Sequence, residues 1–246
     1  MKREEKKDIK KLMKVKLLSY TKDPEQIIAA AIRQCYSAVG SSELKKKIDK
    51  ETRERMIKQV MGSGHTSTLE HASFTFGIEG ISRACSHQLV RHRIASFSQQ
   101  SQRYVNEIKN NFEFVIPPKI KAIKKANVEF LKTMKNLRMV YEDLIEMGVV
   151  PEDARFVLPN AAATKIVVTM NARALLHFFE LRCCKRAQWE IQELANLMLA
   201  EVRKIAPIIF EKAGASCITT GICWEGKKMS CGLYKKIKGA EVRTRI

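Results

Sequence analysis

Several common signatures are missing from this sequence. It has neither a glycine-rich dinucleotide fingerprint nor a P-loop, so any bound nucleotide must be held in another way. No run approaches 18 apolar residues, and the N-terminal MKREEKKDIKK lacks a signal peptide's apolar stretch, so membrane function is set aside. Aromatic residues make up only 7%, too few for a surface that stacks single-stranded nucleic acid.

Cysteine and histidine spacings also exclude familiar sites. The seven cysteines form no evenly spaced disulfide framework, which favours a reducing, cytoplasmic location. No pair has the His-x-x-x-His or Cys-x-x-Cys spacing of zinc ligands, so we expect no metal. Cys217, Cys223 and Cys231 either join a small metal clip or are plain buried thiols, and the second interpretation is favoured.

Positive charge, in contrast, is abundant. The chain has 45 Lys and Arg against 26 Asp and Glu, a net charge of +19. Three Lys-rich segments carry most of the surplus, in residues 1–16, 118–138 and 226–246, and are typical of solvated helix faces or tails. Residues 83–106 are different, because they hold four arginines and no acid, interleaved with His, Gln and Ser. The charge predicts an anionic partner, and a basic nucleic-acid-binding module is the alternative function it leaves open.

Hydrophobic periodicity predicts a single α/β (α+β) domain, a mixed sheet flanked by long helices. Phe74, Phe76 and Ile78 alternate as on a half-buried strand, and the β-branched run 164–169 is typical of a central strand. The other expected strands are 15–20 and 112–116, and the expected helices are 25–37, 42–61, 81–90, 119–147, a short one from Pro151, 172–183 and 188–213 with a possible kink at Pro207.

Two polar constellations stand out against this framework. The first is Arg91-His92-Arg93 through Arg103, and continuing the apolar stripe of the helix 81–90 puts Gln88, Arg91 and His92 on its core-facing side. Buried arginines need an anion from a ligand or from elsewhere in the fold, and their fork suits phosphate. A nucleotide pocket and a solvated basic loop are both compatible with this segment.

The second constellation follows the strand 164–169. Arg182 extends an apolar stripe of Leu175 and Phe178, whereas Arg173 and His177 form an i, i+4 pair on a neighbouring face. Polar groups at the carboxyl end of a strand commonly bind ligands in α/β proteins. An arginine that pairs with Glu180 or Glu190 is the alternative.

At these residues the chain resembles the flavin-dependent thymidylate synthases (ThyX type). Their signature is Arg-His-Arg, seven residues, then Ser and x-Arg, here Arg91-His92-Arg93, Ser101 and Arg103. The resemblance covers roughly residues 15–215 and includes further ordered motifs, among them His65-Thr-Ser-Thr-Leu-Glu-His71, Ala154-Arg155-Phe-Val-Leu-Pro159, Asn171-Ala-Arg173 and Ala187-Gln-Trp-Glu190. It implies a charged N-terminal extension at 1–14, a catalytic domain at 15–215 and a basic cysteine-containing tail at 216–246.

The resemblance also implies an activity and a set of site residues. The activity is reductive methylation of dUMP to dTMP, with methylenetetrahydrofolate as carbon donor, bound FAD, NADPH as reductant, and a homotetramer whose active sites are built from several chains. Arg182 corresponds to the catalytic arginine that faces the uracil. Residues matching dUMP-binding positions are Gln88, Arg91, Gln99, Gln100, Ser101, Gln102, Arg103, Arg155 and Arg182. Residues matching FAD-binding positions are Ser67, Arg91, His92, Arg93, Gln99, Asn171, Arg173 and His177.

Three positions depart from the pattern of many family members. Ser98 and Gln99 stand where Asn and Glu are frequent, and His177 stands where Asn is frequent. Gln99 keeps the length and hydrogen-bonding ability of Glu but loses its charge. A carboxylate role at this position is therefore not expected here.

Overall fold

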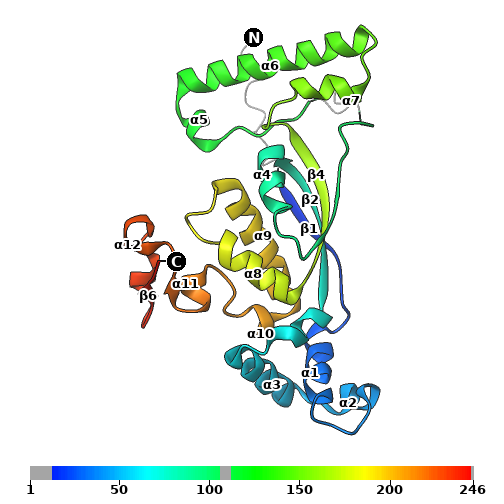
Figure 1. The fold of residues 1–246 in the computed structure, drawn as a ribbon, viewed down its shortest axis with the longest axis vertical. Coiled ribbons are helices and arrows are strands. Elements are labelled where there is room, and N and C mark those ends of the chain that lie inside the picture. The colour runs from blue at the N-terminus through cyan, green and yellow to red at the C-terminus, as the bar shows by residue number, and fades with distance from the viewer. Residues whose placement is uncertain (1–12, 106–111, 245–246) are drawn as a thin grey trace, which may run out of the picture. The chain divides into compact units, whose positions relative to one another are not determined.

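The computed structural model describes residues 13–105 and 112–244, so the predicted extension 1–14 lies almost wholly outside it. Four strands form one sheet in the order β1-β2-β4-β3. Their bounds are β1 Lys14–Tyr20, β2 Ser73–Ser82, β3 Ser96–Gln99 and β4 Ala163–Asn171. Figure 1 labels β1, β2 and β4 of this sheet. The combination of sheet and helices agrees with the predicted α/β class, and the run 164–169 lies in a central strand as expected.

Alternation decides which strand faces are buried. Phe74, Phe76 and Ile78 of β2 are buried while their neighbours are partly accessible, as the sequence predicts. In β4 the buried positions are Thr164, Ile166, Val168 and Met170. Period-two burial of this kind gives each central strand one face packed in the core.

The described residues form two compact units. The first holds residues 78–91 and 97–167, and the second holds 15–77, 92–96 and 168–244. In the first unit α4 (Arg83–Leu89) follows β2, and α5 (Pro118–Ala122) leads into the long α6 (Lys124–Glu146). Helix α6 packs against α7 (Pro151–Ala154) and η2 (Arg155–Val157), as Figure 1 shows. The predicted domain boundaries near residues 14 and 215 stay predictions.

The second unit contains most of the helices. Helix α1 (Pro24–Gln34) packs against α2 (Ser41–Lys47), α3 (Lys50–Ser63) and η1 (Thr66–His71). Helix α8 (Ala172–Arg182) packs against α9 (Trp189–Ile205), which is followed by α10 (Pro207–Phe210). The tail holds small elements only: α11 (Ser216–Thr219), β5 (Ile222–Cys223), α12 (Gly226–Met229), η3 (Leu233–Lys236) and β6 (Glu241–Val242).

Several predicted boundaries are wrong for local reasons. The helix expected at 42–61 is two helices, because Asp49 caps a new one by accepting a hydrogen bond from Thr52 N at 2.8 Å. Pro207 separates α9 from α10 instead of kinking one helix. Residues 112–116 contribute a single bridge, Phe114 to Ala162, instead of a strand.

Candidate functional site

Helix α4 places the first polar constellation. Ser82 Oγ accepts a hydrogen bond from Cys85 N at 3.0 Å, so a short side chain caps the helix where β2 ends. The helix ends at Leu89, before the Arg-His-Arg segment. The predicted stripe therefore does not continue through that segment: Gln88 and His92 are half-buried, but Arg91 is exposed, as is Arg93.

His92 is joined to the predicted catalytic arginine. Arg182, the last residue of α8, donates a hydrogen bond from Nε to His92 Nε2 at 3.0 Å. The His92 ring also meets Phe178 edge to face, with centroids 4.9 Å apart. His92 and Arg182, which are 90 residues apart in the sequence, thus form a polar pair at the end of α8.

A row of buried aromatic rings supports this pair. Phe178 meets Phe179, Phe179 meets Phe210, and Phe210 meets Phe74, with centroids 5.7, 6.0 and 5.6 Å apart. All four rings are fully buried. Each edge-to-face contact adds about 0.5–1.5 kcal/mol beyond area burial, so His92 rests against a rigid part of the core.

The environment keeps His92 neutral. Burial, followed by the positive charges of Arg182 and His177, lowers the pKa of His92 from 6.5 to about 4. Because Nε2 accepts from Arg182, the proton of the neutral ring lies on Nδ1. His92 therefore orients the guanidinium without competing for an anion, and its Nδ1–H remains a donor.

The N-terminal end of α8 places three further predicted residues. Asn171 caps the helix by accepting a hydrogen bond at Oδ1 from Ala174 N, 2.8 Å away. Exposed Arg173 forms an ion pair with Glu70 of η1 at 2.5 Å, and His177 is also exposed one turn further on. Ser67 is exposed on η1, the element that carries Glu70. A helix N-terminus with an adjacent arginine is suited to an anionic group.

The segment after Arg93 begins with β3, a strand that the sequence did not predict. Gln99 donates from Nε2 to Ser86 Oγ at 2.9 Å and to Thr164 Oγ1 at 3.2 Å, so its amide links β3 to α4 and β4. The backbone N–H of Gln100 bonds Lys165 O at 2.9 Å. Gln100, Ser101 and Gln102 are half-buried at the end of this strand.

Glu152 is an acidic residue that pairs with an arginine of residues 83–106, the segment that contains no acid of its own. Its carboxylate accepts a hydrogen bond from Arg103 at 2.8 Å, and its backbone carbonyl accepts one from Arg155 Nε at 3.0 Å. Both members of the Arg103 ion pair are nearly half exposed, so solvent screens the pair and it adds little to the stability of the fold. A phosphate could therefore replace the carboxylate as a partner of Arg103 at little cost.

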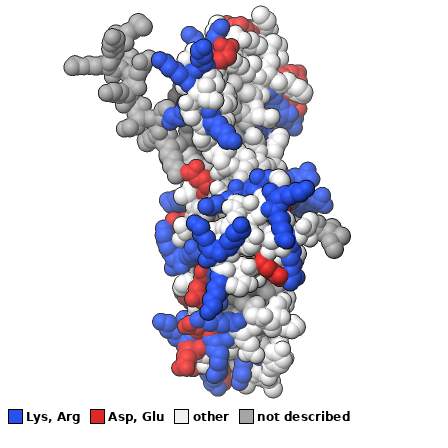
Figure 2. All heavy atoms as spheres, turned by 90° about the vertical axis from the view of Figure 1, so that its left-hand side faces the viewer, with Lys and Arg blue, Asp and Glu red and all other residues white. Residues whose placement is uncertain are grey.

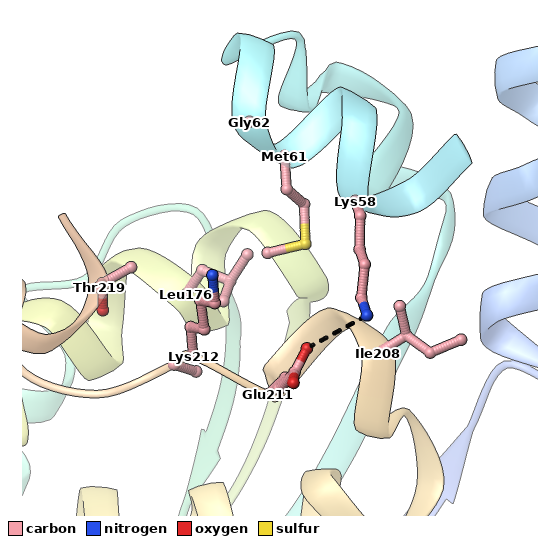
Figure 3. Close-up of a pocket in the computed structure, with 9 residues that line it drawn as sticks. Lys58, Met61, Gly62, Leu176, Ile208, Glu211, Lys212 and Thr219 are labelled. Carbon is pink, nitrogen blue, oxygen red and sulfur yellow. Dashed lines mark ion pairs between the residues drawn. The ribbon is translucent and has the colours of Figure 1, made fainter. Parts of the chain in front are cut away.

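Two cavities in the second unit lie apart from these residues. One, of about 390 Å³, is lined by residues of α3, α8 and α10 and by Lys212, and Figure 3 shows Lys58 and Glu211 facing each other 3.8 Å apart at its wall. The other, of about 620 Å³, lies against α1 and α2 and includes His71. Neither is lined by a predicted site residue.

Reasoning from the sequence missed the partners of the arginines. Glu70 lies within the His65–His71 motif, and this position was a signal that could have identified it. Glu152 lies in no motif, and Ser86 and Thr164 are plain hydroxyl residues of a helix and a strand.

Within residues 13–105 and 112–244, none of the helices has the length and apolar character that a bilayer-spanning segment requires.

Comparisons with known proteins identify the family. Residues 16–208 match the family described as "Thymidylate synthase complementing protein". The flavin-dependent thymidylate synthase of Geobacter sulfurreducens is 54% identical over 226 residues, covering 92% of this chain and 97% of the relative. That of Clostridium tetani is 46% identical, covering 92% and 96%.

A solved structure has a similar fold. The UMP/dUMP methylase PolB of Streptomyces cacaoi, bound with 5-Br dUMP, superposes with a TM-score of 0.69 at 24% identity, covering 81% of this chain and 93% of that one. The family match and the curated relatives define the class of protein, which is that of thymidylate-forming enzymes. The chain belongs to the family of flavin-dependent thymidylate synthases.

Proposed function

We propose that this protein methylates dUMP reductively to dTMP, with bound FAD, methylenetetrahydrofolate as carbon donor and NADPH as reductant. The observation that carries the proposal is the 54% identity with the Geobacter enzyme over almost the whole of both chains. We further propose a cytoplasmic homotetramer with active sites shared between chains.

The residues at the two ends of α8 fit a flavin nucleotide and a uracil. The Oδ1 of Asn171 accepts a hydrogen bond from Ala174 N at the N-terminus of α8. We propose that its amide N–H groups bind the ligand. Arg173 is exposed beside the same helix end, and its pair with Glu70 is half solvated and exchangeable. When bound, the flavin supplies the hydride chemistry, so the protein needs no covalent nucleophile.

Arg182 is the residue proposed to act on the pyrimidine. Its Nε donates a hydrogen bond to His92, which fixes the plane of the guanidinium that we propose lies against the uracil ring. A fixed cation there favours the N3-deprotonated ring and stabilises negative charge that develops during reduction at C6 and carbon attachment at C5. Ser101 serves as a ligand-binding serine near Arg103.

The dUMP phosphate is assigned to the arginines around Glu152. Arg103 and Arg155 already share this residue as a partner, so both are held close to one anionic group. Gln88, Arg91 and the Gln99–Gln102 stretch complete the proposed dUMP set. Ser67, Arg91, His92, Arg93, Gln99, Asn171, Arg173 and His177 are the proposed FAD set.

The proposal is tested by spectroscopy and turnover. The purified protein should be yellow, its flavin absorption should change when dUMP is added, and it should release tritium from [5-³H]dUMP when folate and NADPH are present. Arg182→Ala should lower turnover by at least about 100-fold, because it removes a charge-assisted contact made in the transition state. Normal turnover in that variant, or a preparation that binds neither flavin nor dUMP, would refute the assignment.

A further inference from the structure

Four cysteines from two distant parts of the chain gather in the C-terminal tail of the second unit. Cys217 and Cys223 are buried, each 6% exposed, in a small cluster with Ala215. Cys184, two residues after Arg182, packs against the same cluster. The sequence had suggested only the trio of Cys217, Cys223 and Cys231, and the fold adds Cys184 from the other end of α9.

Cys231 is tied to the group through Ser230. Cys223 Sγ donates to Ser230 Oγ at 3.4 Å, and the same hydroxyl accepts a bond from Gly232 N at 3.1 Å, so the turn that carries Cys231 is held beside Cys223. Burial, followed by the nearby thiols of Cys223, Cys184 and Cys231, raises the pKa of Cys217. Cys217 therefore has the thiols of Cys184, Cys223 and Cys231 in its neighbourhood.

The tail has little else to hold it together. Its regular elements are two-residue strands and helices of four residues, and the buried members of its cluster are only Ala215, Cys217 and Cys223. Loop-rich segments with so small a core usually depend on a disulfide or a structural metal. In a reducing cytoplasm a metal held by thiolates is the stable alternative.

We propose that Cys184, Cys217, Cys223 and Cys231 bind one structural Zn²⁺ that anchors the C-terminal tail to the end of α8. Four thiolates are a standard ligand set for a closed, tetrahedral zinc site. The step is Zn²⁺ plus four thiols giving a tetrathiolate complex of charge −2 and four released protons, with no redox change. The surrounding tail carries a surplus of Lys and Arg, which offsets the negative charge of the complex.

Binding requires the thiols to close around the ion. Among residues 13–105 and 112–244, no three Cys, His, Asp or Glu side chains already lie close enough to share a metal. Cys231 is exposed and precedes Gly232, whose φ of 79° marks a turn, so this ligand lies on the short turn that Ser230 holds beside Cys223. The N–H of Arg186 already bonds Cys184 Sγ at 3.5 Å, a contact that also stabilises a thiolate.

The first measurement is the metal content of the full-length protein purified under reducing conditions without added chelator. Mass spectrometry of the metal should find about one zinc per chain. After the zinc is removed with a thiol reagent and chelator and the thiols are reduced again, Co²⁺ should give the sulfur-to-cobalt charge transfer and the intense visible bands of a tetrahedral tetrathiolate. A chain without zinc that also gives no such cobalt spectrum, or a site filled by iron, would overturn the proposal.

Variants identify the ligands. Cys217→Ser and Cys223→Ser should each lower the zinc content at least about tenfold and allow trypsin to cut the tail between residues 226 and 244, because a lost ligand opens the site. Cys35→Ser and Cys183→Ser are matched controls, since Cys35 is exposed on α1 and Cys183 lies outside the cluster. Equal zinc in all four variants contradicts the assignment, as does non-reducing mass spectrometry that finds disulfides among the four cysteines.

Discussion

At the scale of single residues, the structure gives His92 a contact that motif matching does not predict. The family resemblance places His92 among the residues that contact the flavin. In the structure its Nε2 accepts a hydrogen bond from Arg182 Nε. An arginine with one nitrogen fixed presents the rest of its fork in a defined plane. His92 is thus a positioning residue for Arg182, in addition to any contact with a ligand.

Replacing His92 tests this positioning role. His92→Ala should lower kcat by about 10- to 100-fold, the effect of losing one hydrogen bond to a charged group. His92→Gln can still accept a hydrogen bond and should retain more of the activity. Kinetics of tritium release measure both, and the flavin content of each variant, read from its visible spectrum, shows whether cofactor loss is responsible. Equal losses in the two variants would argue against positioning.

The pKa of His92 also predicts how stability depends on pH. In the unfolded chain His92 titrates near 6.5, and in the folded chain its pKa is about 4. Between these values the unfolded chain binds a proton that the folded chain does not, so the free energy of unfolding falls as the pH drops from about 6.5 to about 4. Above about pH 6.5 this contribution is constant.

Denaturant unfolding at pH 7 and pH 5 measures the effect. The wild type should lose more stability between these pH values than His92→Gln, which has no proton to gain. Other groups titrate in the same range, but they are common to both proteins and cancel in the comparison. Parallel losses would show that His92 is not held neutral by the fold.

At the scale of secondary-structure elements, α8 depends on the aromatic row beneath it. Phe178→Leu should cost about 1–2 kcal/mol of stability and also lower turnover, because it removes the ring against which His92 rests. Phe210→Leu is the matched control, because Phe210 is equally buried in the same row but its ring meets Phe74 and Phe179 instead of His92. Thermal unfolding and kcat of the two variants separate packing from positioning. Similar turnover in both would remove the link between Phe178 and the site.

Many of the helices and strands could be predicted, because they follow from the local spacing of apolar residues. Alternating Phe74, Phe76 and Ile78, and the β-branched run in β4, gave the two central strands. The polar strand β3 could not be predicted, since its sequence Ser-Phe-Ser-Gln becomes a strand only through pairing with β4. Likewise, the break between α2 and α3 depends on one capping side chain, Asp49, inside a continuous helical pattern.

The pairings between the candidate site residues and their partners could not be predicted from the sequence. Arg103 and Glu152 are 49 positions apart, and Arg173 and Glu70 are 103 apart. Such pairs arise from tertiary contacts, which no sequence spacing contains. The same reason explains why Cys184 was not associated with the three cysteines of the tail.

At the scale of the whole molecule, the charge of +19 is largely a property of the surface. Figure 2 shows Lys and Arg side chains over one face with acidic side chains among them. Several form exposed ion pairs within one helix, such as Lys47 with Glu43 and Lys58 with Glu54. In the Lys-rich segment 118–138, Lys119, Lys124 and Lys132 are exposed on α5 and α6, which agrees with the expectation of solvated helix faces there.

The proposed homotetramer is tested by molecular mass. Several large apolar side chains are strongly exposed, including Phe156 at 83%, Tyr104 at 80% and Ile94 at 75%. Partner chains would cover such side chains. Light scattering after size exclusion should give about 112 kDa, four times the chain mass of 28.1 kDa. A mass near that of one chain would contradict shared active sites.

The length of α8 has a consequence for how this family can vary. Arg173 and Arg182 are nine residues apart on one helix, which sets them about 13.5 Å apart along its axis and on opposite sides. Inserting or deleting one residue between them would turn Arg182 by about 100° and carry it away from His92. A single substitution in α8 leaves Arg173 and Arg182 in place, whereas an insertion or deletion between them moves one relative to the other. Related sequences should therefore differ here in composition but not in the number of residues.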